Sequence, residues 1–202
     1  MHQVSAQRHC CEFDIDFCLY TVYIYNPSFE HPIILADSPG CPSYWSGGYN
    51  VIVIKSQSDN YGGVVAADGN QLLVLSNGAY ITQSVTFTPG LTYLLTFSAA
   101  SSYFDDAASL AVDVGSATMV MDAPLRSYMM ATYFMRFVPD STSEAVTFSY
   151  ACARFSCTKA FYIDSVFLQK GEPNLNMMRS ILHGKLLSNI LFALPFRIFL
   201  RI

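Results

Sequence analysis

Charge is scarce in this chain of 202 residues. Charged residues make up 13% of it and hydrophobic residues 52%, whereas soluble domains usually carry ~25% charged residues. Low charge with many Tyr, Ser, Thr and Asn residues favours an extracellular β-protein over a cytosolic helical enzyme. All 15 acidic residues lie at or before Glu172, and four of the 11 basic residues follow it. The acidic body therefore excludes nucleic acid as a partner, because nucleic acid requires a basic face.

The sequence also lacks catalytic signatures. It contains no Gly-x-Ser-x-Gly elbow, and its four histidines lie at the ends or in a loop without metal-ligand spacing. Asp105 and Asp106 are adjacent on a loop, so their side chains diverge instead of flanking a glycosidic bond. We therefore expect no catalytic residues and a protein that is not an enzyme.

Neither end of the chain resembles a folded domain. Residues 1–16 lack the basic start and apolar core of a signal peptide. Residues 17–25 are apolar but too short to span a membrane, so segment 1–25 contains either a first strand or sequence from an incorrect start site. Segment 171–202 is a basic, apolar tail that is either helical or disordered. Its second half carries Arg197, Arg201 and Pro195, and we expect no membrane contact from it, although an interfacial amphipathic segment is the alternative.

The stretch from Tyr61 to Ser98 carries the clearest pattern. It predicts strands at 71–75, 79–87 and 92–98, with turns at Asn77-Gly78 and Pro89-Gly90. In the middle strand Ile81, Gln83, Val85 and Phe87 alternate with Tyr80, Thr82, Ser84 and Thr86. This period of two predicts one face on a core and one in water.

Similar runs of alternating or β-branched residues recur on both sides of this stretch. They predict further strands at 50–55, 109–114, 117–121, 127–138, 145–150 and 161–169. About nine strands with turn signals between them, and no convincing helix before residue 172, are typical of a sandwich or jelly roll. We predict an all-β fold, an antiparallel β-sandwich over residues 26–170.

Two of the six cysteines lie close together in the sequence. Cys152 and Cys157 flank a short connection between two β-like runs, so a hairpin would bring them within disulfide distance. The alternative is a pair of free, buried thiols. A zinc site would need two more ligands at similar spacing, and the sequence shows none.

Five sequence pieces in order resemble one group of proteins. These are NPSFE, an aromatic loop with Trp45, ADGNQLLVL, ITQSVTFTPGLTYLLTFSAA and FYIDSVFLQ. Together they cover about residues 26–169 and resemble the galactose-binding-domain-like jelly rolls. The most similar are a plant cell-wall family, domain of unknown function 642, and related carbohydrate-binding modules.

The resemblance implies a location and a cofactor. It implies carbohydrate binding in a cell wall or extracellular matrix, and a structural calcium near the first and last strands. The matching carboxylates are Glu30 and Asp164. A carboxylate at each chain end plus loop carbonyls would suit calcium, which binds several oxygens. The alternative is that both carboxylates cap turns or pair with basic neighbours.

Candidate ligand-binding residues are those that could stack on a pyranose or fix its hydroxyls. They come from one glycine-flanked loop and two predicted strands: Tyr44, Trp45, Tyr49, Tyr80, Gln83, Tyr128 and Arg136. For Trp45 a core position under the loop is an equal alternative, and Arg136 lies either in a groove or in water. We predict a noncatalytic glycan-binding protein outside the cell. The alternatives are an adhesion domain with a protein partner, and an accessory fragment of a glycoside hydrolase.

Overall fold

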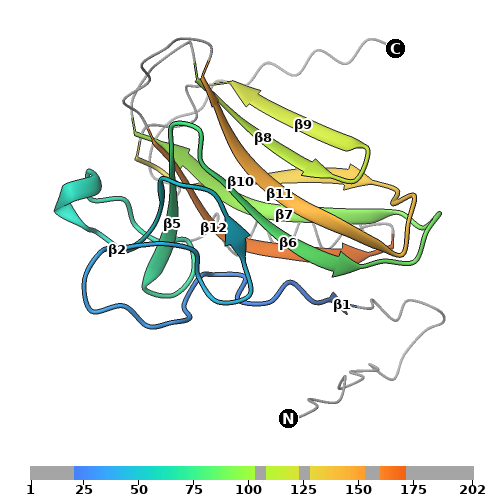
Figure 1. The fold of residues 1–202 in the computed structure, drawn as a ribbon, viewed down its shortest axis with the longest axis horizontal. Helices are drawn as coiled ribbons and strands as arrows, with labels where there is room; N and C mark the ends of the chain where they lie inside the picture. The colour runs from blue at the N-terminus through green and yellow to red at the C-terminus, as the bar shows by residue number, and fades with distance from the viewer. Residues whose placement is uncertain (1–20, 103–107, 123–127, 153–159, 172–202) are drawn as a thin grey trace, which may run out of the picture. The chain divides into compact units, whose positions relative to one another are not determined.

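The protein is seen in a computed structural model that describes residues 21–102, 108–122, 128–152 and 160–171. The chain divides into two compact units, 1–171 and 172–202, and all described residues belong to the first. Two antiparallel sheets face each other as the layers of a sandwich (Figure 1). Within the described ranges, no helix is long and apolar enough to cross a membrane.

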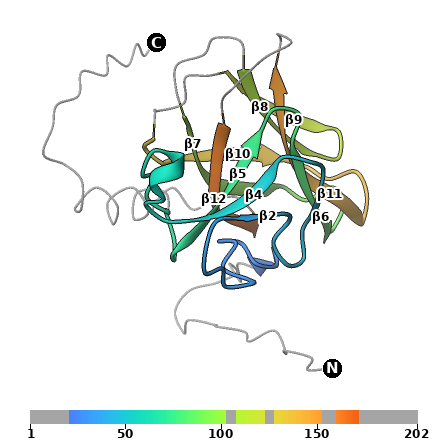
Figure 2. The ribbon, with the colours of Figure 1, turned by 60° about the vertical axis from the view of Figure 1, so that its left-hand side comes forward.

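The larger sheet, sheet A, has seven strands. Their order is β10-β7-β12-β5-β4-β2, with β1 paired to β12, and Figure 2 shows β12, β5, β4 and β2 side by side. The bounds are β1 (Thr21–Val22), β2 (Ser38–Pro39), β4 (Val51–Lys55), β5 (Gln71–Ser76), β7 (Tyr93–Ser101), β10 (Ala131–Phe137) and β12 (Ala160–Lys170).

The smaller sheet, sheet B, has five strands in the order β3-β6-β11-β8-β9. Their bounds are β3 (Ser46–Gly47), β6 (Tyr80–Thr86), β8 (Ala108–Val114), β9 (Ala117–Asp122) and β11 (Ser143–Cys152). The short 3-10 helix η1 (Asp59–Tyr61) is the one helical element among the described residues. The prediction of an all-β antiparallel sandwich is confirmed.

The core lies between the two sheets and follows the period of two. In β6 the side chains of Ile81, Gln83 and Val85 are buried, whereas Tyr80 and Ser84 are exposed. Aromatic rings continue the core across both sheets, through the contacts Phe29–Trp45, Trp45–Phe148 and Phe97–Phe148. The alternation predicted for this strand is therefore confirmed.

Part of the outer face of sheet A is buried as well. A second apolar cluster there contains Ile54, Leu72, Val74, Ala100 and Tyr162, all at most 1% exposed. Val64 and parts of Tyr61 and Ala66, from the loop between β4 and β5, complete this cluster. The loop therefore covers this part of the outer face and removes it from water, whereas Thr96, Arg136 and Phe167 of the same sheet remain at least partly exposed.

The outer face of sheet B is polar. Apart from Tyr80 at the start of β6, the side chains that alternate outward along β6 and β11 are small and mostly hydroxylated: Thr82, Ser84, Thr86, Ala145, Thr147 and Ser149. None of them is buried. This face is therefore in contact with water along both strands.

One predicted strand begins later than expected. The pattern predicted a strand over 127–138, but β10 begins at Ala131. Tyr128 has a φ of 56°, in the left-handed region, and its N–H donates to Ser101 O. This conformation departs from the extended backbone of a strand, and the chain turns here before β10 begins.

Candidate functional site

Exposed tyrosines gather along the edge of sheet B where β3 pairs with β6. They are 58%, 69%, 93% and 45% exposed, in the order Tyr25, Tyr44, Tyr49 and Tyr80. We call these four residues the tyrosine edge. Exposed aromatic rings of this kind can stack on the apolar face of a sugar while their hydroxyls stay in water.

Two of these tyrosines form a stacked pair. The ring centroids of Tyr25 and Tyr44 lie 5.3 Å apart with an angle of 28° between the planes. The side-chain amide of Gln83 is hydrogen-bonded to the backbone of both tyrosines. Its Nε2 donates to Tyr25 O at 2.9 Å and Tyr44 O at 3.2 Å, and its Oε1 accepts from Tyr25 N at 2.8 Å. One buried amide of β6 therefore fixes the position of the pair.

Tyr80 is attached to the same loop through Gly48. The N–H of Gly48 donates to Tyr80 O, and a Cβ on Gly48 would lie 2.7 Å from the Tyr80 ring. Only glycine allows the loop to approach the ring this closely. The aromatic loop is therefore bound to β6 at two places, at Tyr44 through Gln83 and at Gly48 through Tyr80. Tyr49 follows Gly48 in the sequence.

The tyrosine edge borders a row of hydroxyl groups on the outer face of sheet B. In this row Ser46 pairs with Thr82, Thr82 with Thr147, and Thr147 with Asp113. The Oγ1 atoms of Thr82 and Thr147 lie 2.9 Å apart. Aromatic rings beside hydroxyl and carboxylate groups are a combination that suits sugar binding.

The structure places Trp45 in the core. It is 5% exposed, its rings contact Phe29 and Phe148, and its Nε1–H donates to Asn26 O at 3.3 Å. This is the alternative that the sequence left open. Trp45 therefore supports the loop from inside and offers no surface to a ligand. Gln83 is likewise buried, so its amide positions the tyrosines and does not reach a sugar.

Two predicted ligand residues lie away from the tyrosine edge. Tyr128 packs on the outer face of sheet A, with its ring 6.3 Å from that of Tyr162. Arg136 is exposed on β10 and pairs with Leu94 of β7 in sheet A. The structure therefore unites Tyr44, Tyr49, Tyr80 and Gln83 but not these two residues.

Tyr25 is a candidate that sequence reasoning missed. The segment around it is apolar throughout, so no polar partner residues marked an exposed face. The structure shows alternation within the apolar run, with Tyr23 and Tyr25 exposed and Ile24 buried between them. Two tyrosines flanking a single isoleucine were the available signal, because Tyr tolerates partial exposure better than Ile does.

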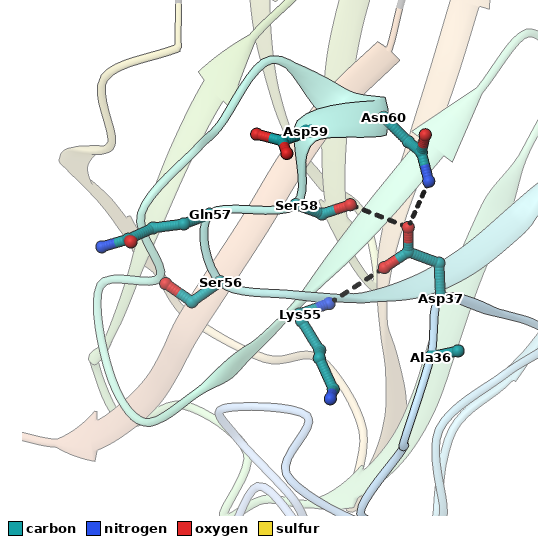
Figure 3. A pocket seen from close by; sticks show the side chains of 8 residues that line it. All are labelled: Ala36, Asp37, Lys55, Ser56, Gln57, Ser58, Asp59 and Asn60. Atoms are coloured by element: carbon teal, nitrogen blue, oxygen red, sulfur yellow. Dashed lines mark hydrogen bonds between the residues drawn. The ribbon is translucent and has the colours of Figure 1, made fainter.

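A separate polar pocket lies beside β4, with a cavity volume of about 450 Å³. Figure 3 shows Asp37 in it, with Oδ2 accepting from Ser58 Oγ at 2.7 Å and Asn60 Nδ2 at 3.3 Å. Lys55 N donates to Asp37 Oδ1. The residues that line it are Ala36, Asp37, Lys55, Ser56, Gln57, Ser58, Asp59 and Asn60. It contains no aromatic platform, so it suits a sugar less well than the tyrosine edge.

The two carboxylates of the calcium prediction meet the same loop. Glu30 Oε1 accepts the N–H groups of Asn70 and Gln71, and Asp164 Oδ2 accepts those of Ala67 and Asp68. Across the described residues, no group of three His, Cys, Asp or Glu side chains could hold a metal. The oxygens face N–H donors, so the residues as they lie do not fit a calcium ion.

Burial dominates the electrostatics of Asp164. Desolvation raises the pKa of this fully buried carboxyl to about 7. Hydrogen bonds from the N–H groups of Asp68, Ser165 and Ala67 oppose the shift, and the nearby charge of Asp68 adds to it. Asp164 therefore titrates near neutral pH.

The predicted disulfide stays a prediction. Cys152 ends β11, but Cys157 lies outside the described residues, as do Asp105, Asp106 and segment 171–202 beyond Gly171. Cys41 is a free, half-buried cysteine that packs against the core.

The sequence was compared with protein families. The model of the family described as protein of unknown function (DUF642) matches residues 24–168. The chain belongs to this family. The matched segment begins at the buried Ile24, ahead of the tyrosine pair, and ends in β12. It therefore includes the whole of sheet B, sheet A apart from β1 and the end of β12, and the whole tyrosine edge. Among curated proteins, none matches the chain.

Solved structures share the fold of this DUF642 domain. A CBM61 module in complex with β-1,4-galactotriose is 17% identical, with a TM-score of 0.52, and the match covers 73% of this chain and 97% of that one. An arabinose-bound GH51 α-L-arabinofuranosidase is 12% identical, with a TM-score of 0.50 and coverages of 76% and 27%. The C-terminal family 22 carbohydrate-binding module of Clostridium thermocellum Xyn10B is 14% identical, with a TM-score of 0.48 and coverages of 77% and 94%. The domain therefore has the fold of carbohydrate-binding modules, as its sequence resemblance predicted.

Proposed function

We propose that this domain is a noncatalytic glycan-binding module that acts outside the cell, in a wall or matrix. The observation that carries the proposal is the tyrosine edge beside the hydroxyl row of sheet B. The Tyr25–Tyr44 stack and Tyr80 offer rings to the apolar face of a sugar. Thr82, Thr147 and Asp113 lie on the adjoining sheet face, where sugar hydroxyls could reach them.

The fold and the composition support the proposal from two sides. A structural neighbour with nearly its whole length matched was solved with β-1,4-galactotriose bound, and it is a carbohydrate-binding module. The low charge of the chain suits an extracellular β-protein. Detection of the tagged full-length protein inside cells, and its absence from the wall or medium fraction, would contradict an extracellular role.

The test is retention of the full chain in native gels that contain one polysaccharide each: β-1,4-galactan, arabinan, xylan, a mixed-linkage glucan or pectin. We expect retardation in at least one of them. Tyr44→Ala and Tyr80→Ala should each weaken the retained complex about tenfold, equivalent to roughly 1.4 kcal/mol, because each removes an aromatic contact.

Phe167→Ala is the matched control. Phe167 is 45% exposed, as Tyr80 is, but it lies on β12 in sheet A. Its removal should leave retention unchanged. Equal losses in Phe167→Ala and Tyr80→Ala would contradict the tyrosine edge as the site. Failure of the folded protein to bind any polysaccharide would point to a protein partner, since tyrosines are also enriched at protein interfaces. Release of sugars by the isolated chain would refute the noncatalytic part.

A further inference from the structure

The turn 66–71 lies at the end of the loop between β4 and β5 and leads directly into β5. Two carboxylates from opposite ends of the domain accept hydrogen bonds from its backbone. Asp164 comes from β12, the last strand, and Glu30 from the segment after β1. Asp164 Oδ2 accepts from Ala67 N at 2.6 Å and Asp68 N at 2.9 Å. Glu30 Oε1 accepts from Asn70 N and Gln71 N, both at 2.7 Å.

The four donors form two pairs of successive backbone N–H groups. Each pair points at a single carboxylate oxygen, which is the arrangement by which backbone amides bind anions. Gly69 separates the pairs with a φ of 69°, and a Cβ there would collide with Glu30 Oε1. Only glycine therefore lets the turn direct both pairs inward.

A cation at this turn would be repelled, because the N–H dipoles present their positive ends to it. Calcium in proteins is bound by six to eight oxygen atoms, including carbonyl oxygens, whereas this turn presents the positive ends of N–H bonds. Both oxygens of Asp164 are already acceptors, because Oδ1 takes the N–H of Ser165 at 2.7 Å. Asp68 Oδ2 accepts from Ser28 Oγ at 2.6 Å.

We infer that the carboxyl groups of Glu30 and Asp164 hold the turn 66–71 as internal acceptors of two backbone N–H pairs, in the place where the resemblance implied a calcium ion. The two carboxylates join the N-terminal segment and the last strand through this turn without a metal. The hydrogen bond from Ser28 to Asp68 and the fully buried ring of Phe29 strengthen the same junction.

The first test measures the melting temperature of the full chain with calcium chloride and with EDTA. We expect the same Tm in both, and no calcium in the chelator-free protein by elemental analysis. A Tm that rises with calcium, and no longer rises in Glu30→Gln, would overturn the inference, because the carboxylate would then be a metal ligand.

The second test uses a small external anion. Glu30→Ala empties the N–H pair of Asn70 and Gln71, which solvent can reach from the side of the exposed Asn70, although Gln71 is buried. We expect Glu30→Ala to lower Tm by several degrees, and sodium acetate to restore part of this loss relative to sodium chloride at equal ionic strength. Acetate should not stabilise the wild type in the same comparison, because its N–H pair is already filled.

The second test has a control variant and a replacement variant. Asp122→Asn is the control, because Asp122 is an exposed carboxylate at the end of β9, and its Tm should change little with either salt. If Glu30→Ala does not fold, Glu30→Gln is compared with the wild type instead: its amide oxygen fills the N–H pair without the charge, so we expect a lower Tm that acetate does not restore. Recovery of Glu30→Ala by calcium instead of acetate, or a Glu30→Gln Tm equal to that of the wild type, would refute the assignment.

Discussion

The two outer faces of this sandwich differ in what covers them. On sheet A, large apolar side chains lie under the loop between β4 and β5, and Tyr162, Leu72 and Ile54 are at most 1% exposed. On sheet B, hydroxyl side chains face outward, and Val120 is 59% exposed. The covered part of sheet A stabilises the domain, whereas the outer face of sheet B stays in contact with water. The candidate ligand residues that lie together are found along the edge of this open face, where β3 pairs with β6.

The largest effect should come from the covered face. Leu72→Ala removes a fully buried side chain beneath the loop and should lower the free energy of unfolding by about 2–5 kcal/mol. Val120→Ala, on the outer face of sheet B, should cost less than about 0.5 kcal/mol. Urea denaturation of both variants measures the difference. Equal costs would mean that the outer face of sheet B is also packed.

Asp164 should make the free energy of unfolding of the domain depend on pH. Its folded pKa of about 7 lies above the ordinary aspartate pKa of 3.8, so the folded state binds the proton more tightly than the unfolded state. Its contribution is therefore fully present below about pH 4 and is lost as pH rises through about 7, on the order of 1 kcal/mol per unit.

Asp164→Asn should abolish this slope because the amide does not titrate. It should also be less stable at every pH, since an amide NH₂ would face an N–H donor that the carboxylate now accepts. Urea unfolding of the wild type and the variant across this pH range measures both effects. An unchanged slope in the variant would assign the pH dependence to other groups.

The sandwich fold could be predicted from the sequence, because buried and exposed residues alternate with a period of two along its strands. In β6 the alternation of apolar and polar residues assigned Ile81 to the core and Tyr80 to the surface, as the structure shows. Strand pairing order was not predictable in this way. It depends on which strands lie adjacent after long connections, such as the one that places β12 between β5 and β7.

The site was predicted less completely, because it depends on tertiary contacts. Trp45 and Tyr44 are neighbours in one loop, yet one is buried and the other 69% exposed, since Tyr44 has a φ of 71° that reverses the chain. Gln83 was predicted to contact sugar because it is polar on a strand. Its buried face instead lies under the Tyr25–Tyr44 pair, and only the fold brings those two residues together.

The smallest effect on stability should come from the hydroxyl row of sheet B. Thr147→Val keeps the shape of the side chain but removes the hydroxyl that lies 2.9 Å from Thr82 Oγ1, and the free energy of unfolding should change by less than about 0.5 kcal/mol. If a glycan lies across this face, retention in the polysaccharide gels should fall severalfold. Thr96→Val, on the outer face of sheet A, is the control and should change neither quantity. Unchanged retention in Thr147→Val, together with loss in Tyr80→Ala, would restrict the site to the tyrosine edge, because a chain that crossed the sheet would have to contact the hydroxyl row.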